Sequence, residues 1–487
     1  MFEQRSVRGG IALGIAAFAG FAGFVLAGAA SAAAQGGAIV AAATDELPPA
    51  VFAARRAQLV AELGADAVAV LAAPPSCVRN GDNDYPYRTG SDFWYLTGFA
   101  EEEAVAVVET RDGKAHCTLF VPPRSPGQEM WTGRRLGAAG ARVLAEEVVE
   151  LGRRGDVGAK LKELLHGKKR VLGQFERNDA RRAAVKAALD TGVDVDETEL
   201  RNAVGRLRRV KGPEELALLQ RSIDNTCEAL RQAMRSCRPG MREYELQAVV
   251  EYCFTALGSP RLGFDSIVGS GRNSVILHYM SNRETIPSGK TVVCDVGAEY
   301  GFYSADVTRT LPSDGRFTPE CAAVYRAVLA SQKAGIAAAK PGATLRAIEA
   351  AARKELVRCL VLEGVVAKGQ ENLAASLLPH GTCHWLGLDT HDECLGDTTL
   401  APGMVTTVEP GCYIPAGTAG VAEKFWDVGV RIEDDVLITE EGCVVLSAGA
   451  PREIEEIEKQ MAEGSDFPRL EPAAKPARTP TAGPPEK

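Results

Sequence analysis

The sequence lacks patterns that mark several common functional classes. It has 12 cysteines, but no two are spaced as C-x-x-C, so neither a zinc ribbon nor a thioredoxin-type redox pair is supported. It has no H-E-x-x-H segment, because Gly381 follows His380 where a zincin helix carries glutamate. No basic stripe could neutralise phosphates, so nothing indicates a nucleic-acid partner.

Glycine-rich loops that bind phosphates or present a nucleophile are also absent. The segment Gly269-Ser270-Gly271 fits neither G-x-S-x-G nor a full G-x-G-x-x-G. We interpret it as a glycine turn that positions His278.

What is present suggests a two-domain globular protein. A chain of 487 residues favours two domains, or at most three. Helical and strand-like spacing predicts a helix over 48–63, strands over 67–73, 104–109 and 117–121, and a helix over 140–151. This alternation indicates an α/β (α+β) fold, with a small first domain over 48–208. Pro213 then begins a strongly periodic helix and a second domain over 213–457, and a Pro- and Ala-rich tail over 464–487 is predicted to be disordered.

The first 34 residues differ from the rest. Arg5 and Arg8 precede an apolar run of Ala, Gly and Phe that ends in small-residue sites. This pattern predicts a secretory signal peptide over 1–34 and an exported protein, with an uncleaved membrane anchor as the alternative. Many cysteines fall in apolar runs, which favours buried free thiols over a disulfide framework. Because free thiols suit the cytosol better, a cytoplasmic location remains open.

Two aspartates are predicted to lie close together in the second domain. Residues 291–300 and 302–311 are both strand-like, and a hairpin centred on Tyr300-Gly301 would place Asp295 directly opposite Asp306. Two carboxylates at that distance repel each other unless a cation lies between them. The alternative is a pair of solvent-facing aspartates on an edge hairpin.

Histidines and further acids follow in the same half of the chain. The segment 378–392, LPHGTCHWLGLDTHD, holds His380, His384 and His391 among glycines that allow close backbone approach. Glu409 and Glu433 lie in Val-rich, strand-like segments, where an unpartnered buried carboxylate is costly. We expect Asp434 or Asp435 to face solvent instead.

These segments together resemble the aminopeptidase P branch of the pita-bread metallopeptidases. The second-domain matches are IVGSGRNSVILHY (267–279), CDVGAEYGFYSADVTRT (294–310), HGTCHWLGLDTHD (380–392), TVEPGCYI (407–414) and VRIEDDVLIT (430–439). In the first domain, DNDYPYRTGSDFWYLTGF (82–99) and MWTGRRLG (130–137) look like aminopeptidase P more than its relatives. The resemblance covers about residues 50–450 and implies a pita-bread catalytic domain after the first domain.

The resemblance implies a site with two divalent metal ions, usually Mn²⁺. The implied ligands are Asp295, Asp306, His384, Glu409 and Glu433. Of these, Asp306 and Glu433 would bridge both ions. A hydroxide between the ions would attack the first peptide bond, and Glu409 would carry a proton to the leaving proline nitrogen.

Other roles are implied for residues around these ligands. His391 and His278 would contact the substrate near the scissile bond, and His380 would border the proline pocket. Arg431 would support the charges beside Glu433. Trp131 and Asp82 would line the site from the same or a neighbouring subunit of a dimer or tetramer.

Three functions remain open on these residues. The favoured one is release of the N-terminal residue from peptides with proline in second position. The second is a Xaa-Pro dipeptidase, and the YPYR and GRRLG segments favour the first over it. The third is a non-catalytic peptide-binding protein on the same fold, against which all five intact ligand types argue.

Overall fold

The computed structural model describes residues 47–151, 157–175, 180–190, 192–392, 398–465 and 467. The predicted signal peptide over 1–34 lies outside these residues, as does nearly all of the predicted tail over 464–487. Within the described residues, no helix combines the length and the apolar character needed to cross a bilayer.

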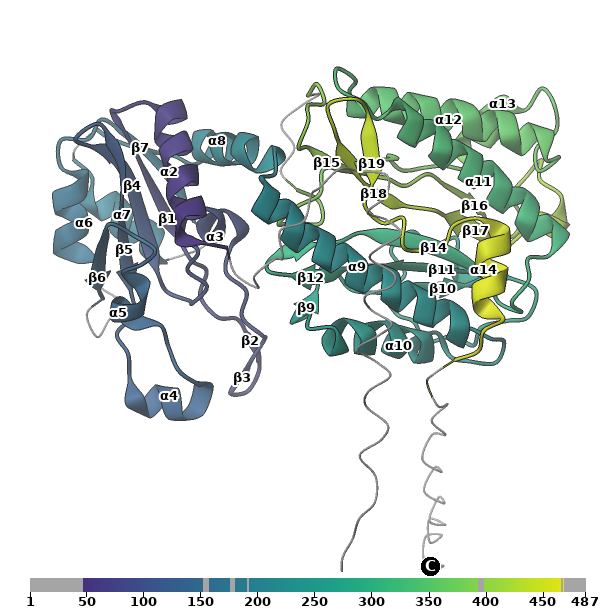
Figure 1. Ribbon diagram of the computed structural model, residues 1–487, viewed down its shortest axis with the longest axis horizontal. Coiled ribbons are helices and arrows are strands. Elements are labelled where there is room, and N and C mark those ends of the chain that lie inside the picture. The colour runs from purple at the N-terminus through teal and green to yellow at the C-terminus, as the bar shows by residue number, and fades with distance from the viewer. Residues whose placement is uncertain are drawn as a thin grey trace, which may run out of the picture. The chain divides into compact units, whose positions relative to one another are not determined.

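The first half of the described chain forms a six-stranded mixed sheet between two layers of helices (Figure 1). Its strand order is β6-β5-β4-β1-β7-β8. The elements are α2 (Pro49–Leu63), β1 (Ala67–Ala72), β2 (Val78–Asn80), β3 (Asn83–Asp84), α3 (Ser91–Thr97), β4 (Val105–Arg111), β5 (Lys114–Val121), α4 (Pro126–Thr132), α5 (Gly137–Ala141), β6 (Glu147–Glu150), α6 (Gly158–Leu165), β7 (Arg170–Gln174), α7 (Ala180–Ala188), β8 (Val195–Asp196) and α8 (Glu197–Arg209).

Strand alternation explains why both faces of this sheet are covered. Val68 and Val70 of β1 pack into the core beside α6 and α7, whereas Ala69 and Leu71 join the core beside α2 and α3. Because side chains alternate across a strand, a strand that is apolar throughout is buried on both faces. The predicted strands over 67–73, 104–109 and 117–121 and the helix over 48–63 are confirmed.

The predicted helix over 140–151 is wrong. Its first residues belong to α5, which ends at Ala141, and Glu147–Glu150 form the edge strand β6. This strand pairs in parallel with β5, matching Val148 to Leu119. Two adjacent β-branched valines suit a pleated surface, and pairing with β5 outweighs the local helical spacing.

The second half is built from small antiparallel sheets with helices on either side (Figure 1). Helices α9 and α10 lie on one side of the strands, and α11, α12 and α13 lie on the other. The elements are α9 (Pro213–Ser236), α10 (Glu243–Ala256), β9 (Arg261–Leu262), β10 (Ile267–Ser270), β11 (Thr291–Val296), β12 (Ala298–Tyr300), β13 (Tyr303–Ser304), β14 (Val307–Pro312), α11 (Pro319–Ala338), α12 (Leu345–Leu362), α13 (Glu371–Ser376), β15 (Val405–Val408), β16 (Gly411–Ile414), β17 (Val428–Arg431), β18 (Asp434–Ile438), β19 (Cys443–Val445) and α14 (Ile454–Met461).

The helix predicted to begin at Pro213 is confirmed as α9. Proline suits the first helical turn because its missing N–H needs no partner there. Glu215 Oε2 accepts a hydrogen bond from the backbone N–H of Gly212 at 2.9 Å and satisfies one further orphan donor.

The hairpin that carries the two aspartates is real, but its predicted register is wrong by two residues. The turn is centred on Gly301-Phe302, with φ of 54° and 72°, as a type I′ turn requires. Asp295 therefore pairs with Thr308, and Asp306 precedes β14. Phe302 stacks on Trp94 with ring centroids 4.5 Å apart, a contact that accompanies its unusual backbone conformation.

The prediction of free thiols is confirmed for the described cysteines, and burial is confirmed for most of them. Eleven are described and all are free; eight of them are buried, and Cys77 is exposed. Cys294 and Cys412 act as small apolar residues within strands of the core.

Candidate metal centre

Five acidic and histidine side chains meet where separate elements of the second half come together. Asp295 is the penultimate residue of strand β11, and Asp306 directly precedes β14, the strand that pairs with β11. His384 lies in the segment before β15, Glu409 follows β15, and Glu433 lies between β17 and β18. The five predicted ligands come from segments spread over 139 residues and are brought together only by the antiparallel pairing.

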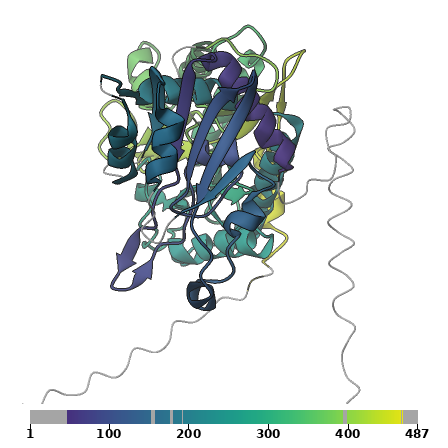
Figure 2. The same ribbon diagram turned by 90° about the vertical axis from the view of Figure 1, so that its left-hand side faces the viewer.

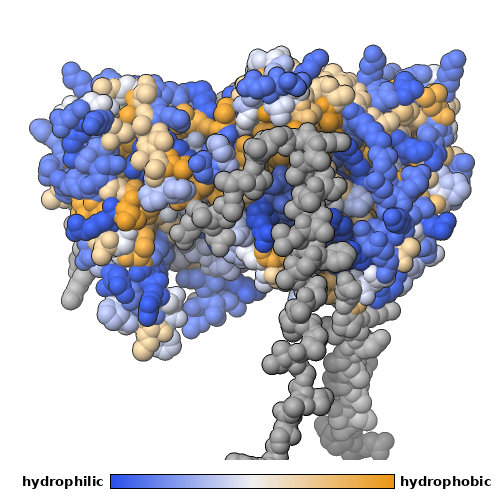
Figure 3. Space-filling view, in the orientation of Figure 1, coloured by the Kyte–Doolittle hydropathy of each residue, from blue (hydrophilic) through white to orange (hydrophobic). Residues whose placement is uncertain are grey.

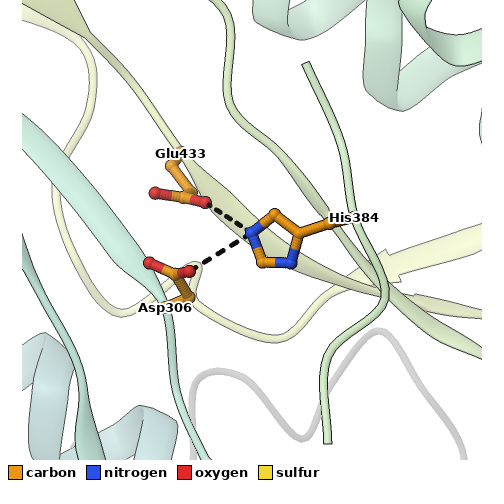
Figure 4. Close-up of side chains that lie close together, drawn as sticks. All are labelled: Asp306, His384 and Glu433. Carbon is orange, nitrogen blue, oxygen red and sulfur yellow. Dashed lines mark ion pairs between the residues drawn. The ribbon is translucent and has the colours of Figure 1, made fainter. Parts of the chain in front are cut away.

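Asp306, His384 and Glu433 form the closest group (Figure 4). His384 Nε2 lies 3.3 Å from Asp306 Oδ2 and 3.9 Å from Glu433 Oε1. It also lies 3.7 Å from Glu409 Oε1. One nitrogen and several carboxylate oxygens pointing at a common centre form a donor set that suits a divalent cation.

The buried acids of this group resist ionisation. Burial and the charge of Asp306 raise the pKa of Glu433 well above its usual value. Burial raises the pKa of Glu409 to about 7, with His384 acting in the opposite direction. Burial opposes the charged form of His384, yet its hydrogen bond to Asp306 raises the pKa of His384 to about 9. Several carboxylates lie close together here with little positive charge nearby, and a bound cation would remove the repulsion between them.

Two buried carboxylate oxygens at this centre accept no hydrogen bond within the described part of the protein. They are Glu433 Oε1 and Asp295 Oδ1, and the residues that carry them are 2% and 8% exposed. An unsatisfied buried carboxylate oxygen is rare, because it forfeits hydration without compensation. The donor atoms therefore fit a metal ion from their own chemistry.

Arg431 forms hydrogen bonds that hold two of the predicted ligands in place. Its Nη2 donates to Asp295 Oδ2 at 2.6 Å, and its Nε donates to Thr308 Oγ1 at 3.4 Å. The Thr308 hydroxyl in turn donates to Glu433 Oε2 at 2.7 Å. Arg431 thus contacts Asp295 directly, and it is connected to Glu433 through the hydroxyl of Thr308.

His380 borders the group on another side. Its Nδ1 lies 3.7 Å from Glu409 Oε2, and its Nε2 lies 2.8 Å from the Tyr413 hydroxyl. Arg431 Nη1 donates to that same hydroxyl at 2.8 Å, and His380 Nδ1 donates to the carbonyl oxygen of Gly381 at 2.6 Å. The other nitrogen of a neutral imidazole is an acceptor, so the Tyr413 hydroxyl donates to His380 Nε2. Burial lowers the pKa of His380 to about 4, which keeps its imidazole neutral.

The two remaining histidines are exposed and come from loops. The ring of His391 lies 4.4 Å from the ring of His384, centroid to centroid. Burial and the nearby charges of His384 and His278 lower the pKa of His391. The structure therefore places His391 at the centre, and it places His278 next to Leu277, whose carbonyl oxygen accepts a hydrogen bond from Arg431 at 3.4 Å.

Known proteins share both halves of this architecture. The pattern for "Metallopeptidase family M24" matches residues 217–440, and the pattern for "Aminopeptidase P, N-terminal domain" matches residues 52–172. Xaa-Pro aminopeptidase of Escherichia coli is 36% identical over 431 residues, which cover 84% of this chain and 97% of that protein. The chain belongs to the Xaa-Pro aminopeptidase family of M24 metallopeptidases.

Other members of the Xaa-Pro aminopeptidase family agree. Human Xaa-Pro aminopeptidase 3 is 32% identical over 423 residues, which cover 82% of each chain. The structure of aminopeptidase P from Escherichia coli with the inhibitor Pro-Leu superposes with a TM-score of 0.80, at 34% identity, covering 86% of this chain and 99% of that one. Membership of this family of metallo-exopeptidases implies divalent metal ions at the centre described above.

Trp131 and Asp82 are the predicted site residues that the structure does not bring to the centre. Both are exposed, Trp131 on α4 and Asp82 at the tip of the β2–β3 hairpin. Figures 1 and 2 show α4 and this hairpin extending from one end of the first sheet. Figure 3 shows mainly hydrophilic surface where Figure 1 places α4, with a small pale-orange area at its lower end. Met130, next to Trp131 on α4, is also exposed.

The expectation that Asp434 or Asp435 faces solvent is wrong, since both are 0% exposed. Asp434 pairs with the buried Arg309 at 2.7 Å, and Asp435 accepts a hydrogen bond from the backbone N–H of Asp306 at 3.2 Å. Sequence reasoning also missed Tyr413 and Thr308. Both stand in matched strand motifs, but their partners lie more than 15 residues away.

Proposed function

We propose that the protein is a two-metal aminopeptidase that releases the N-terminal residue from peptides with proline in second position. The observation that carries the proposal is the largely buried group of Asp306, His384 and Glu433, in which Glu433 Oε1 accepts no hydrogen bond. The family of the chain, whose relatives are named Xaa-Pro aminopeptidases, supports the specificity for proline.

Five residues would hold the ions. Asp306 and Glu433 lie centrally and would contact both, with Asp295 completing one side and His384 and Glu409 the other. Hard oxygen donors with one imidazole suit Mn²⁺. Two such ions, when bound, supply charge that stabilises a developing oxyanion and acidifies water.

Glu409 is the residue that we propose carries a proton. Its side chain is 17% exposed, against 8% for Asp306 and 2% for Glu433, so it is the most accessible carboxylate of the three. Its Oε2 faces His380 at 3.7 Å, on the side away from His384. Glu409 would accept a proton from the attacking water and deliver it to the leaving proline nitrogen, help that is typically worth about 10²–10⁴-fold.

The histidines around the centre would bind the peptide. His391 and His278 are both exposed. The ring of His391 lies 4.4 Å from that of His384, and Leu277, next to His278, accepts a hydrogen bond from Arg431, which supports contacts near the scissile bond. The neutral His380 is held by Tyr413 and would border the proline pocket.

The setting of the enzyme is also a proposal. We infer a homo-oligomer, either a dimer or a tetramer, in which the exposed Trp131 and Asp82 reach the site of a neighbouring subunit. Export after removal of residues 1–34 is supported by the sequence pattern alone.

A comparison of two substrates tests the specificity. Purified protein with Mn²⁺ should cleave a Xaa-Pro-Xaa tripeptide between the first residue and proline. A Xaa-Pro dipeptide should be a poor substrate. Exclusive cleavage of the dipeptide would make the protein a prolidase, and no cleavage of either peptide with metal bound would favour a peptide-binding protein.

A further inference from the structure

The segment that carries His391 is not part of any helix or strand. It runs from Gly387 to Asp392, between the metal-site histidine and the strand β15. Among the described residues, no hydrogen bond fixes the imidazole ring of His391. The orientation of the His391 ring therefore depends on the backbone of residues 387–392 and on the contacts that hold this backbone in place.

A single buried guanidinium holds the segment on both sides of His391. Arg208, near the end of α8, is 3% exposed. Its Nη2 lies 2.6 Å from Asp389 Oδ2 and also donates to Asp392 Oδ1. Its Nη1 donates to Asp92 Oδ1 at 2.7 Å, which fixes the guanidinium against α3. Arg208 thus joins two carboxylates that stand two residues before and one residue after His391.

Neighbouring contacts show that the segment is fastened from the first half of the chain. Arg88 Nη2 donates to the carbonyl oxygen of Leu388 at 2.7 Å, and the Ser91 hydroxyl donates to Asp389 Oδ1 at 2.5 Å. Lys211, which follows α8, lies with its Nζ 3.3 Å from Asp392 Oδ2. A Cβ at Gly387 would collide with the Asp392 carboxylate, so the backbone is packed closely here.

We propose that Arg208 is a positioning residue for the peptidase reaction, acting through Asp389 and Asp392 to aim His391 at the substrate. This inference rests on the substrate contact assigned to His391 in the proposed function. Arg208 touches neither the metal ligands nor the segment's histidine. Its guanidinium has the planar shape needed to join several carboxylates at once, which a lysine ammonium does not have.

The test is the substitution Arg208→Lys, which keeps the positive charge but removes the planar guanidinium that binds several carboxylates at once. We expect kcat/KM on the tripeptide to fall about 10- to 100-fold, with metal content unchanged, because small displacements of a substrate-contacting group are costly. Arg55→Lys is the matched control. Arg55 is also 3% exposed and pairs with Glu215 at 3.1 Å, but it has no contact with residues 387–392. It should lose thermal stability and keep kcat/KM within about twofold.

Coupling to His391 separates positioning from a purely structural role. The double variant Arg208→Lys with His391→Ala should be no slower than His391→Ala alone, because both changes remove the same contact. Multiplying losses, or a kcat/KM for Arg208→Lys equal to that of the Arg55→Lys control, would overturn the proposal. If Arg208→Lys does not fold, Asp389→Asn removes one of the two bonds at a more exposed carboxylate and should give the same coupling.

A crystal structure of Arg208→Lys provides a readout that does not depend on activity. The proposal predicts that the rings of His391 and His384 move from their 4.4 Å separation. An unmoved His391 would overturn it. An inactive wild-type protein would instead sink the proposed function while leaving this structural comparison intact.

Discussion

The proposed metal ligands and the two loop histidines, His278 and His391, are held in different ways. Asp295 is the penultimate residue of β11, whose ladder to β14 is complete over six residue pairs, and Glu433 is fixed between two strands by a backbone hydrogen bond to Thr308. His278 and His391 lie on loops, and buried side chains fasten those loops from outside. Backbone pairing thus places the proposed metal ligands, whereas buried charges hold the loops of the two histidines that we propose contact the substrate.

The loop of His278 is fastened by Glu243 at the start of α10. This carboxylate is 0% exposed, and its Oε1 accepts from the backbone N–H and the hydroxyl of Ser270 and from Asn273 Nδ2. Its Oε2 accepts from the backbone N–H of Glu284 at 2.9 Å. Glu243 therefore joins the two ends of the His278 loop, much as Arg208 joins the two sides of His391.

The largest effect is expected within the strand-held acids. Asp306→Ala should reduce tripeptide hydrolysis to background and lower the bound metal, because Asp306 is the carboxylate nearest His384 Nε2. The measurements are initial rates and metal content after dialysis. Asp265→Ala removes an exposed acid elsewhere and should change neither. Near-normal turnover of Asp306→Ala would refute the site.

A smaller and different effect is expected at the loop anchor. Glu243→Gln turns one acceptor into a donor that faces N–H or O–H groups, so it should lower the free energy of unfolding by about 2 kcal/mol. It should also reduce kcat/KM by moving His278, while metal content stays normal. Loss of metal from this variant would show that the loop of His278 and the proposed metal ligands are not held independently.

The smallest effect is expected from a reducing agent. Since the described cysteines are free, dithiothreitol should change neither the unfolding temperature nor the rate of tripeptide cleavage. Thermal unfolding followed with and without the reductant checks this. A large destabilisation would mean that a disulfide helps to hold one of the two regions.

Much of the site could be predicted from the sequence because its motifs are local. Each of the five acids and histidines assigned as ligands stands in its own short pattern. The structure brings carboxylate oxygens of Asp306, Glu409 and Glu433 to 3.3–3.9 Å from His384 Nε2, and Arg431 holds Asp295 by an ion pair. The register of the Asp295 hairpin could not be predicted. It depends on Phe302, whose positive φ accompanies stacking on Trp94, more than 200 residues earlier.

The contacts that hold the two histidine loops could not be predicted from the sequence either. Nothing near Glu243 or Arg208 in the sequence indicates a role at the site, because their partners lie 27 to 184 residues away. Asp434 looked like the polar position of an alternating strand, yet Arg309 and Arg452 neutralise it in the core. Long-range ion pairs override local alternation in these cases.

A metal titration of the aminopeptidase activity on the tripeptide is the most direct test of the proposed two-metal site. Protein stripped with a chelator should be inactive, and added Mn²⁺ should restore cleavage of the Xaa-Pro-Xaa tripeptide in step with the binding of two ions per chain. Full activity in the metal-free protein, or a rate that does not respond to bound Mn²⁺, would contradict the account.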